Sequence, residues 1–327
     1  MIWSGIRLTQ YGDAVGAHFK LSRTWVGVIL LATVTSLPEL VVTLSAQLAV
    51  ARPRIAMGNV CGSNLINLCI FALLDAFEGP GALSARLGKG LLRPAKMGLV
   101  CMGAAVGALL LPVLVGRGPG IAALGWGLSG GLLVLCLYSM WRTERKDGPE
   151  VVAAIVPAQA RGGNVVARFA AYACLLVISG VGLIYLCDAL VEHEFHVGQS
   201  SFKLSESVVG TTGLAFVTSL PELVVCLMAL RLGAFNMAVG DLLGSNVFNI
   251  MLLPLAHFVR PARAFWSEAM PVHWLSLCAA MVLTVIIMAG IRRRSQWAFL
   301  RLGWDGILVA VVGGSALVVV AALGQMW

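Results

Sequence analysis

The sequence predicts an all-α polytopic membrane protein with ten transmembrane helices, built as two inverted five-helix repeats with broken helices at the midplane. Its composition supports the membrane class, because 59% of the 327 residues are hydrophobic and 12% are charged. A soluble domain has roughly 45–50% apolar and about 25% charged residues. Long charge-poor runs and two repeated motifs supply the helix count and the symmetry. The composition excludes a separate soluble catalytic domain. We interpret the net charge of +8 as charge on the loops, and not as a sign of nucleic-acid binding.

Nine runs are long and apolar enough to cross a bilayer, which takes about 20 residues per helix. They are Trp25–Ala51, Ile55–Leu74, Met97–Val115, Ile121–Trp141, Phe169–Cys187, Val208–Leu230, Ala234–Val259, Ala269–Ile291 and Gly306–Trp327. The spacing of these runs leaves little chain for extramembrane domains.

A tenth span is predicted at Met1–Phe19, although this segment contains Arg7 and Asp13. The sequence SGIRLTQYGDAV from Ser4 resembles SGVGLIYLCDALV from Ser179, which precedes the later copy of the repeat. We expect a short first helix with an outward N-terminus, or a true start codon upstream.

Lysine and arginine sort the loops into two faces, with 16 on one and 7 on the other. The richer face is predicted to be cytoplasmic, so both termini of a ten-helix protein point outward. The predicted organisation is a first repeat at 1–141, a cytoplasmic linker at 142–166 and a second repeat at 167–327. The Arg292–Arg294 cluster is interpreted as a topology signal, with contact to anionic lipid as the alternative.

Two motifs recur in the same order and give the most specific signal in the chain. VTSLPELVV occurs at 34–42 and again at 217–225, an offset of 183 residues. GNVCGSNLIN at 58–67 matches GDLLGSNVFN at 240–249, an offset of 182. The ion motifs therefore occupy 27–74 and 210–253. Five spans separate the copies, so the second enters the membrane upside down, as in many secondary transporters.

Each VTSLPELVV copy places a glutamate, Glu39 or Glu222, about midway along a predicted span. Ionisable residues at this depth cost at least about 2.5–3.5 kcal/mol and normally face a polar cavity. The adjacent Pro38 and Pro221 lack an amide hydrogen, so we expect each helix to break near the preceding threonine.

Oxygen-bearing side chains surround these glutamates at helical spacing. Thr35 and Thr218 lie four residues before the glutamates, beside Ser36 and Ser219, and the following span carries Ser63 and Asn67 or Ser245 and Asn249. Hard cations such as calcium and sodium prefer oxygen ligands. We therefore predict a cation site between the repeats, with Gly58, Gly62, Gly240 and Gly244 permitting close helix approach.

Asp241 breaks the symmetry, because the first repeat has Asn59 at the equivalent position. It shares a helix face with Ser245 and Asn249. We predict that Asp241 lines the inner approach to the site as a further cation ligand. The alternative is a structural pair with a basic residue such as Arg231.

These motifs resemble those of the sodium/calcium exchanger branch of the calcium/cation antiporter superfamily, particularly its compact prokaryotic members. The resemblance implies calcium-for-sodium antiport by alternating access, with the first and sixth helices sliding across a rigid core. It assigns Glu39 and Glu222 as central calcium ligands and the six hydroxyl side chains as calcium or sodium ligands. Asn67 and Asn249 would complete the central layer.

The repeats depart from the family pattern at Val34 and Val217, which replace the glycine of its GTS triplet. Coupling to protons, or transport of a different cation, therefore remains the alternative, because a glutamate removed from water can hold a proton. A passive channel is a weaker alternative, since a carboxylate beside a broken helix in each half favours alternating access.

An enzyme is not indicated, because the five histidines lie near span ends or in loops, away from a repeated serine. The eight cysteines show no CxxC spacing and are interpreted as free, buried thiols. Nothing in the sequence indicates a cofactor or an obligatory protein partner; the expected partners are the transported ions and the bilayer.

Overall fold

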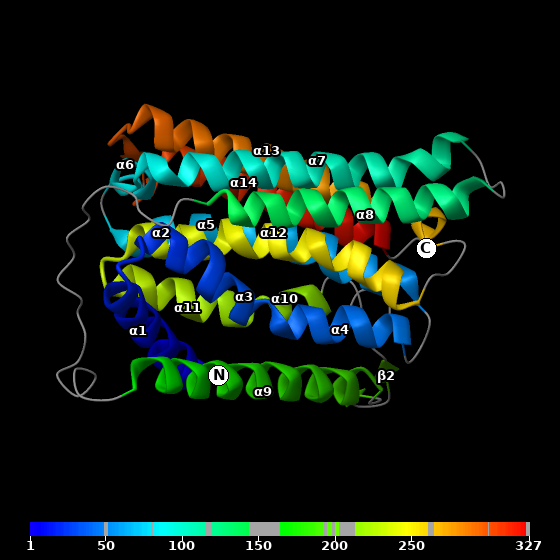
Figure 1. Ribbon diagram of the computed structural model, residues 1–327, viewed down its shortest axis with the longest axis horizontal. Helices are drawn as coiled ribbons and strands as arrows, with labels where there is room; N and C mark the ends of the chain where they lie inside the picture. Colours follow the sequence, from blue (N-terminus) through cyan, green and yellow to red (C-terminus); the bar gives the residue numbers. More distant parts are fainter. Residues whose placement is uncertain are drawn as a thin grey trace.

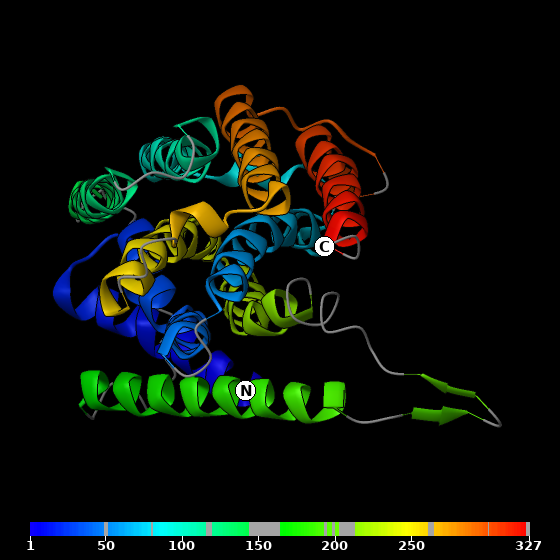
Figure 2. The same ribbon diagram turned by 90° about the vertical axis from the view of Figure 1, so that its right-hand side faces the viewer.

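A computed structural model describes residues 1–48, 52–79, 81–115, 120–143, 164–192, 195–197, 200–202, 213–260, 265–299 and 301–324. These residues form a nearly all-helical bundle (Figures 1 and 2). Of the linker predicted at 142–166, residues 144–163 lie outside the described residues, as do residues 208–212 of the predicted seventh span. The division at this linker stays a prediction.

The helical elements follow the order of the predicted spans. They are α1 (Ile2–Phe19), α2 (Arg23–Trp25), the π-helix η1 (Val26–Leu31), α3 (Ala32–Thr35), α4 (Leu37–Leu48), α5 (Pro53–Glu78), α6 (Leu83–Arg86), the 3-10 helix η2 (Lys89–Leu91), α7 (Leu92–Val115), α8 (Gly120–Trp141), α9 (Val165–Glu192), α10 (Leu214–Thr218), α11 (Leu220–Arg231), α12 (Phe235–Val259), the 3-10 helix η5 (Trp266–Glu268), α13 (Pro271–Arg293) and α14 (Trp304–Gly324).

Two short antiparallel hairpins depart from the all-α prediction. One pairs β1 (Phe195–Val197) with β2 (Ser200–Phe202), and the other pairs β3 (Ala298–Phe299) with β4 (Leu302–Gly303). Both connect helices that follow one another along the chain. Strands of two or three residues are too short to show the hydrophobic alternation by which a sequence predicts a strand.

Eight helices in the described part of the chain are long and apolar enough to cross a membrane, or nine if the bent pair Arg23–Thr35 and Leu37–Leu48 forms one span. All nine predicted apolar runs correspond to these candidates. The N-terminal segment is helical, as expected, but α1 is not among the candidates. It carries Asp13, which forms an ion pair with Arg23 at 2.8 Å. The tenth span stays a prediction.

Helices α5 and α12 form the centre of the bundle (Figure 1). Within their most apolar 18-residue windows, 72% and 78% of residues are buried, against 22% in α9 and in α14. Helices α7, α8, α13 and α14 lie on one side of this central pair. The broken helices, α1 and α9 lie on the other side (Figure 2). The two GSN motifs therefore lie in the most buried helices of the fold.

Backbone-to-backbone packing joins η1 to α12, as the glycine spacing predicts for the second repeat. A Cβ on Gly244 would lie 2.2 Å from the carbonyl oxygen of Val28. A Cβ on Gly27 would lie 2.3 Å from that of Met237. No larger residue fits at either position without moving a backbone, so these glycines fix the close approach of the first broken helix to α12.

The prediction of buried thiols holds for part of the chain. Seven of the eight cysteines are described as free, and Cys61, Cys101, Cys136 and Cys226 are buried. Cys174 on α9 is exposed, and Cys69 and Cys278 are half-buried, which corrects the expectation. An apolar run predicts a membrane helix, but it does not distinguish the lipid-facing side from the packed side.

Candidate cation site

Both predicted helix breaks are confirmed. Helix α3 ends at Thr35 and α4 begins at Leu37, with Ser36 between them at φ −88° and ψ 8°. In the second copy α10 ends at Thr218 and α11 begins at Leu220, with an equivalent turn at Ser219. The first break bends the helix pair by 41°. Each glutamate thus lies in the first turn of a helix in the middle of the bundle.

The hydroxyls at the two breaks each contact the opposite repeat. The Thr35 Oγ1 atom donates to Asp241 Oδ1 at 3.3 Å and lies 3.4 Å from Ser245 Oγ. In the equivalent arrangement, Thr218 Oγ1 donates to Asn59 Oδ1 at 3.4 Å and lies 3.3 Å from Ser63 Oγ. Equivalent residues therefore make equivalent contacts after the repeats are exchanged, as a two-fold relation requires.

The carboxylates of Glu39 and Glu222 are completely buried at this junction. Ser36 Oγ donates to Glu222 Oε1 at 3.1 Å, a further contact between the repeats. Thr218 lies beside the Glu39 carboxylate. Asp241 is also completely buried and accepts a hydrogen bond from Thr35 at the first break. A positive charge among these buried carboxylates would offset the cost of removing them from water.

Several predicted ligand atoms are buried and have no hydrogen-bond partner within the described residues. They are both carboxylate oxygens of Glu39, Oε2 of Glu222, the hydroxyl of Ser219 and the amide groups of Asn67 and Asn249. Leaving a buried polar group unpaired costs about 1–3 kcal/mol, and more for a charged group. These groups supply oxygen, the donor type that hard cations prefer.

The cluster is not a compact centre of acidic side chains. Within the described residues, no three His, Cys, Asp or Glu side chains are grouped closely enough to hold a metal ion by themselves. Hydroxyl and amide oxygens separate the carboxylates. A cation between the broken helices would therefore need these neutral oxygens as well as the carboxylates.

Asp241 lies next to Thr35 in this cluster, and its predicted role as a ligand on the inner approach stays a prediction. It is fully buried and receives hydrogen bonds from Thr35 and, at 3.4 Å, from Cys226 Sγ. The alternative partner, Arg231, is exposed. Thr35 and Cys226, which donate these hydrogen bonds, are uncharged, so no basic side chain among them neutralises Asp241. Asp241 therefore adds a third carboxylate to the cluster.

A second difference between the repeats accompanies Asp241 and was not predicted: the first repeat has Thr43 where the second has Cys226. In the first repeat Asn59 Nδ2 donates to Thr43 Oγ1 at 3.1 Å. Cys226 occupies the position equivalent to Thr43 and bonds to Asp241, the equivalent of Asn59. The alignment of the repeats could have shown this pair, because the offset of 183 aligns Thr43 with Cys226 and the offset of 182 aligns Asn59 with Asp241.

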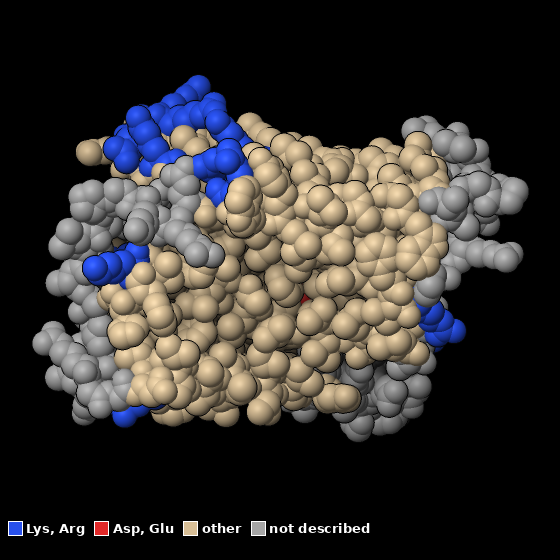
Figure 3. Space-filling view, in the orientation of Figure 1, with Lys and Arg blue, Asp and Glu red and all other residues tan. Residues whose placement is uncertain are grey.

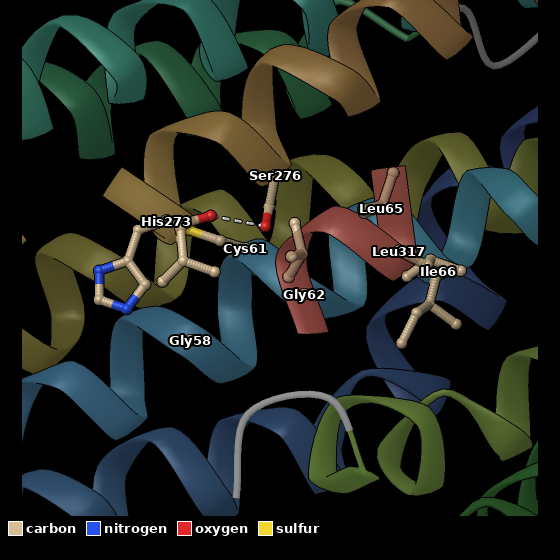
Figure 4. A pocket seen from close by; sticks show the side chains of 10 residues that line it. Gly58, Cys61, Gly62, Leu65, Ile66, His273, Ser276 and Leu317 are labelled. Carbon is tan, nitrogen blue, oxygen red and sulfur yellow. Dashed lines mark hydrogen bonds between the residues drawn. The ribbon is translucent and has the colours of Figure 1, made fainter. Parts of the chain in front are cut away.

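A separate small hollow lies between α5, α13 and α14 (Figure 4). Its walls include Gly58, Cys61 and Gly62, and Ser276 Oγ donates to the Val272 carbonyl at 2.7 Å. His273 also lines it. The lining is largely apolar, so this hollow does not supply the oxygen ligands found at the helix breaks.

The model of the family described as sodium/calcium exchanger protein matches residues 1–141 and 171–323. The inner membrane protein YrbG of Escherichia coli (strain K12) is 27% identical over 291 residues, which are 88% of this chain and 84% of YrbG. The putative antiporter CaxA of Alkalimonas amylolytica is 27% identical over 252 residues, covering 77% of this chain and 74% of CaxA. The sodium/calcium exchanger MaX1 of Methanosarcina acetivorans is 31% identical over 144 residues, covering 42% of this chain and 39% of MaX1.

The fold is similar to that of the sodium-calcium exchanger NCX_Mj. The structure of NCX_Mj soaked with 100 mM Na⁺ and 10 mM Sr²⁺ superposes with a TM-score of 0.64 at 22% identity. The alignment covers 97% of this chain and 93% of the other. The structure soaked with neither Na⁺ nor Ca²⁺ gives a TM-score of 0.60. These likenesses extend across both halves of the chain.

Proposed function

Because the chain belongs to the sodium/calcium exchanger family, we propose that it exchanges calcium for sodium across a membrane by alternating access. Members of this family are membrane transporters and not enzymes, and antiport of cations follows from the membership. Calcium as the cargo and sodium as the coupling ion are the specific parts of the proposal.

The observation that carries the proposal is that each helix break contacts the central helix of the opposite repeat in the same way. Thr35 contacts Asp241 and Ser245, and Thr218 contacts Asn59 and Ser63. Beside these hydroxyls are two buried glutamates, which can neutralise one divalent cation or accept monovalent cations in its place. Calcium and sodium compete for the same carboxylates, and the site cannot hold both kinds of ion at once. This competition couples the two ion fluxes.

The proposed ligands are the residues singled out in the sequence. Glu39 and Glu222 are the central pair, and Asp241 adds a third carboxylate. The neutral oxygens come from Thr35, Ser36, Ser63, Asn67, Thr218, Ser219, Ser245 and Asn249. This set favours hard cations, and calcium takes six to eight such oxygens. No cofactor has a role in the proposal.

The proposed architecture has ten transmembrane helices in two inverted repeats, with α1 as the tenth span and both termini outside the cytoplasm. Helices α1 and α9 pack against each other and against the broken helices (Figure 2). They are the first helices of their repeats, so movement of this pair across the cluster would open it to alternate sides. Gly180 on α9 lies directly against Pro38 at the first break.

Proton coupling is the second candidate function. The buried carboxylates of Glu39, Glu222 and Asp241 can each hold a proton. The thiol of Cys226, which donates a hydrogen bond to Asp241, is a further proton-holding group. The test is calcium uptake into proteoliposomes under an outward sodium gradient, compared with a proton gradient of equal size. Sodium-driven uptake supports the proposal, whereas uptake driven by protons alone favours this alternative.

A further inference from the structure

A hollow opens at the end of the molecule where α6 meets the β3–β4 hairpin, away from the helix breaks. Its volume is about 480 Å³, and its lining is Gly81, Ala82, Ala85, Arg86, Gln296 and Ala298. Four of these six residues are glycine or alanine, so the walls leave room for a ligand. The guanidinium of Arg86 and the side-chain amide of Gln296 supply polar groups. A volume of this size is within the range of small-ligand sites.

Basic side chains lie beside the hollow. Arg86 lines it, Arg294 donates to the carbonyl of Leu87, the residue after Arg86, and Arg301 lies near Gly79 at the end of α5. Figure 3 shows a dense area of Lys and Arg in its upper left. Among the described acids at this end, Glu78 is paired with Arg86, and Asp75 and Asp305 are completely buried. The described surface around the hollow therefore attracts anions.

Exposed aromatic side chains lie beside the hollow. Trp297 is 57% exposed and Phe299 is 59% exposed, and both lie at the β3 side of the hairpin. Trp297 stands between Gln296 and Ala298, which both line the hollow. Tryptophan is enriched where bilayers meet water. An exposed tryptophan and an exposed phenylalanine therefore lie beside the hollow, and these are side chains suited to contact with a membrane surface.

We propose that this hollow binds the phosphate headgroup of an anionic phospholipid. Arginine matches phosphate oxygens with paired donors, and Gln296 can donate a further hydrogen bond. An excess of positive charge on one face is a general feature of membrane proteins. A general excess of positive charge does not explain why Arg86 and Gln296 line a hollow next to Trp297 and Phe299 at the β3–β4 hairpin. A free phosphate ester shares the headgroup chemistry, but the exposed Trp297 and Phe299 favour a ligand held in the bilayer.

The experiment titrates the purified full-length protein in detergent with phosphatidylglycerol, phosphatidylcholine or glycerol 3-phosphate and follows its thermal unfolding. Gln296→Glu and Gln296→Lys change the charge of the wall in opposite directions and keep the Arg86–Glu78 ion pair. Since a juxtamembrane charge changes anionic-lipid binding about fivefold, we expect Gln296→Glu to weaken binding of phosphatidylglycerol about fivefold. Gln296→Lys should strengthen it by a similar factor.

The control is Lys96→Glu, an exposed position on α7 that does not line the hollow. It removes two units of positive charge, yet it should change the affinity for phosphatidylglycerol less than Gln296→Glu does. A larger effect of Lys96→Glu, equal stabilisation by phosphatidylcholine, equal affinity for glycerol 3-phosphate, or no response to either Gln296 variant would overturn the proposal. Because the readout is lipid binding, its outcome is independent of ion exchange.

Discussion

Gly180→Ala tests whether α9 moves across the first helix break. A Cβ at Gly180 would lie 2.8 Å from Cγ of Pro38, and the next atom of the same ring would be 3.4 Å away. Carbon atoms in packed cores approach to about 3.5–4.0 Å. The added methyl group must therefore displace the proline ring or α9 by about 0.7 Å. The rigid ring of Pro38 cannot rotate away as a longer side chain could.

The cost of such overpacking is typically about 1–3 kcal/mol. If α9 passes over Pro38 during each transport cycle, this cost adds to the barrier, and a factor of ten in rate corresponds to about 1.4 kcal/mol. The expected slowing of exchange is therefore about 5- to 150-fold. Gly182→Ala is the matched control, since Gly182 is on the same helix and a Cβ added there would meet nothing within 4 Å in the described part of the chain.

The assay is calcium uptake into sodium-loaded proteoliposomes, with equilibrium calcium binding measured in parallel. Both substitutions raise helix propensity by a similar amount, so their difference reports the contact with Pro38. We expect slow exchange with nearly unchanged calcium affinity for Gly180→Ala and normal exchange for Gly182→Ala. Equal exchange rates in the two variants would refute the movement of α9 across the break.

Three further results are expected. Glu39→Gln and Glu222→Gln should each lower calcium flux at least a hundredfold, because each removes the carboxylate partner of a buried cation and such a loss costs about 3–5 kcal/mol. Near-normal flux from a folded variant would exclude that glutamate from the site. Asp241→Asn, which copies the first repeat, should flatten the fall of exchange at low pH, since one proton-binding group is lost; an unchanged pH profile from pH 5 to 8 would count against this role. Where zinc competes with calcium for this cluster, Cys226→Thr, which copies Thr43, should raise the zinc concentration needed for half-inhibition about tenfold, because sulfur binds zinc better than a hydroxyl oxygen does. Equal zinc inhibition of the two proteins would show that the thiol does not reach the ion.

The helix breaks were predictable because their causes are local. Proline removes a backbone donor wherever it occurs, and a glutamate within an apolar run must face a polar site. The repeat also predicted that Thr35 and Thr218 lie at equivalent places in the two copies, and each of them ends a helix at a break. Sequence alone did not predict that each threonine contacts the opposite repeat, because that contact depends on how α5 and α12 cross.

Other contacts are set by segments that are distant in the chain. The spacing of Asp241 from Ser245 and Asn249 gives its helix face, but not its complete burial or its hydrogen bond from Thr35. Ser129 was not noticed, although its hydroxyl lies 2.9 Å from Nδ1 of His257 and receives a hydrogen bond from Trp266. These three residues are far apart in the chain, so no local pattern joins them. The β3–β4 hairpin was missed because its strands have two residues each.

The most direct test of the proposed exchange site is to locate a divalent cation in crystals of this protein soaked with strontium, whose anomalous scattering identifies it. We predict a peak between the two helix breaks, with carboxylate oxygens of both Glu39 and Glu222 bound to it at distances slightly longer than the roughly 2.3–2.6 Å of calcium ligands, because strontium is the larger ion. Sodium at high concentration should displace this peak. Strontium bound elsewhere, with none between the two glutamates in protein that is active in transport, would contradict the proposed site.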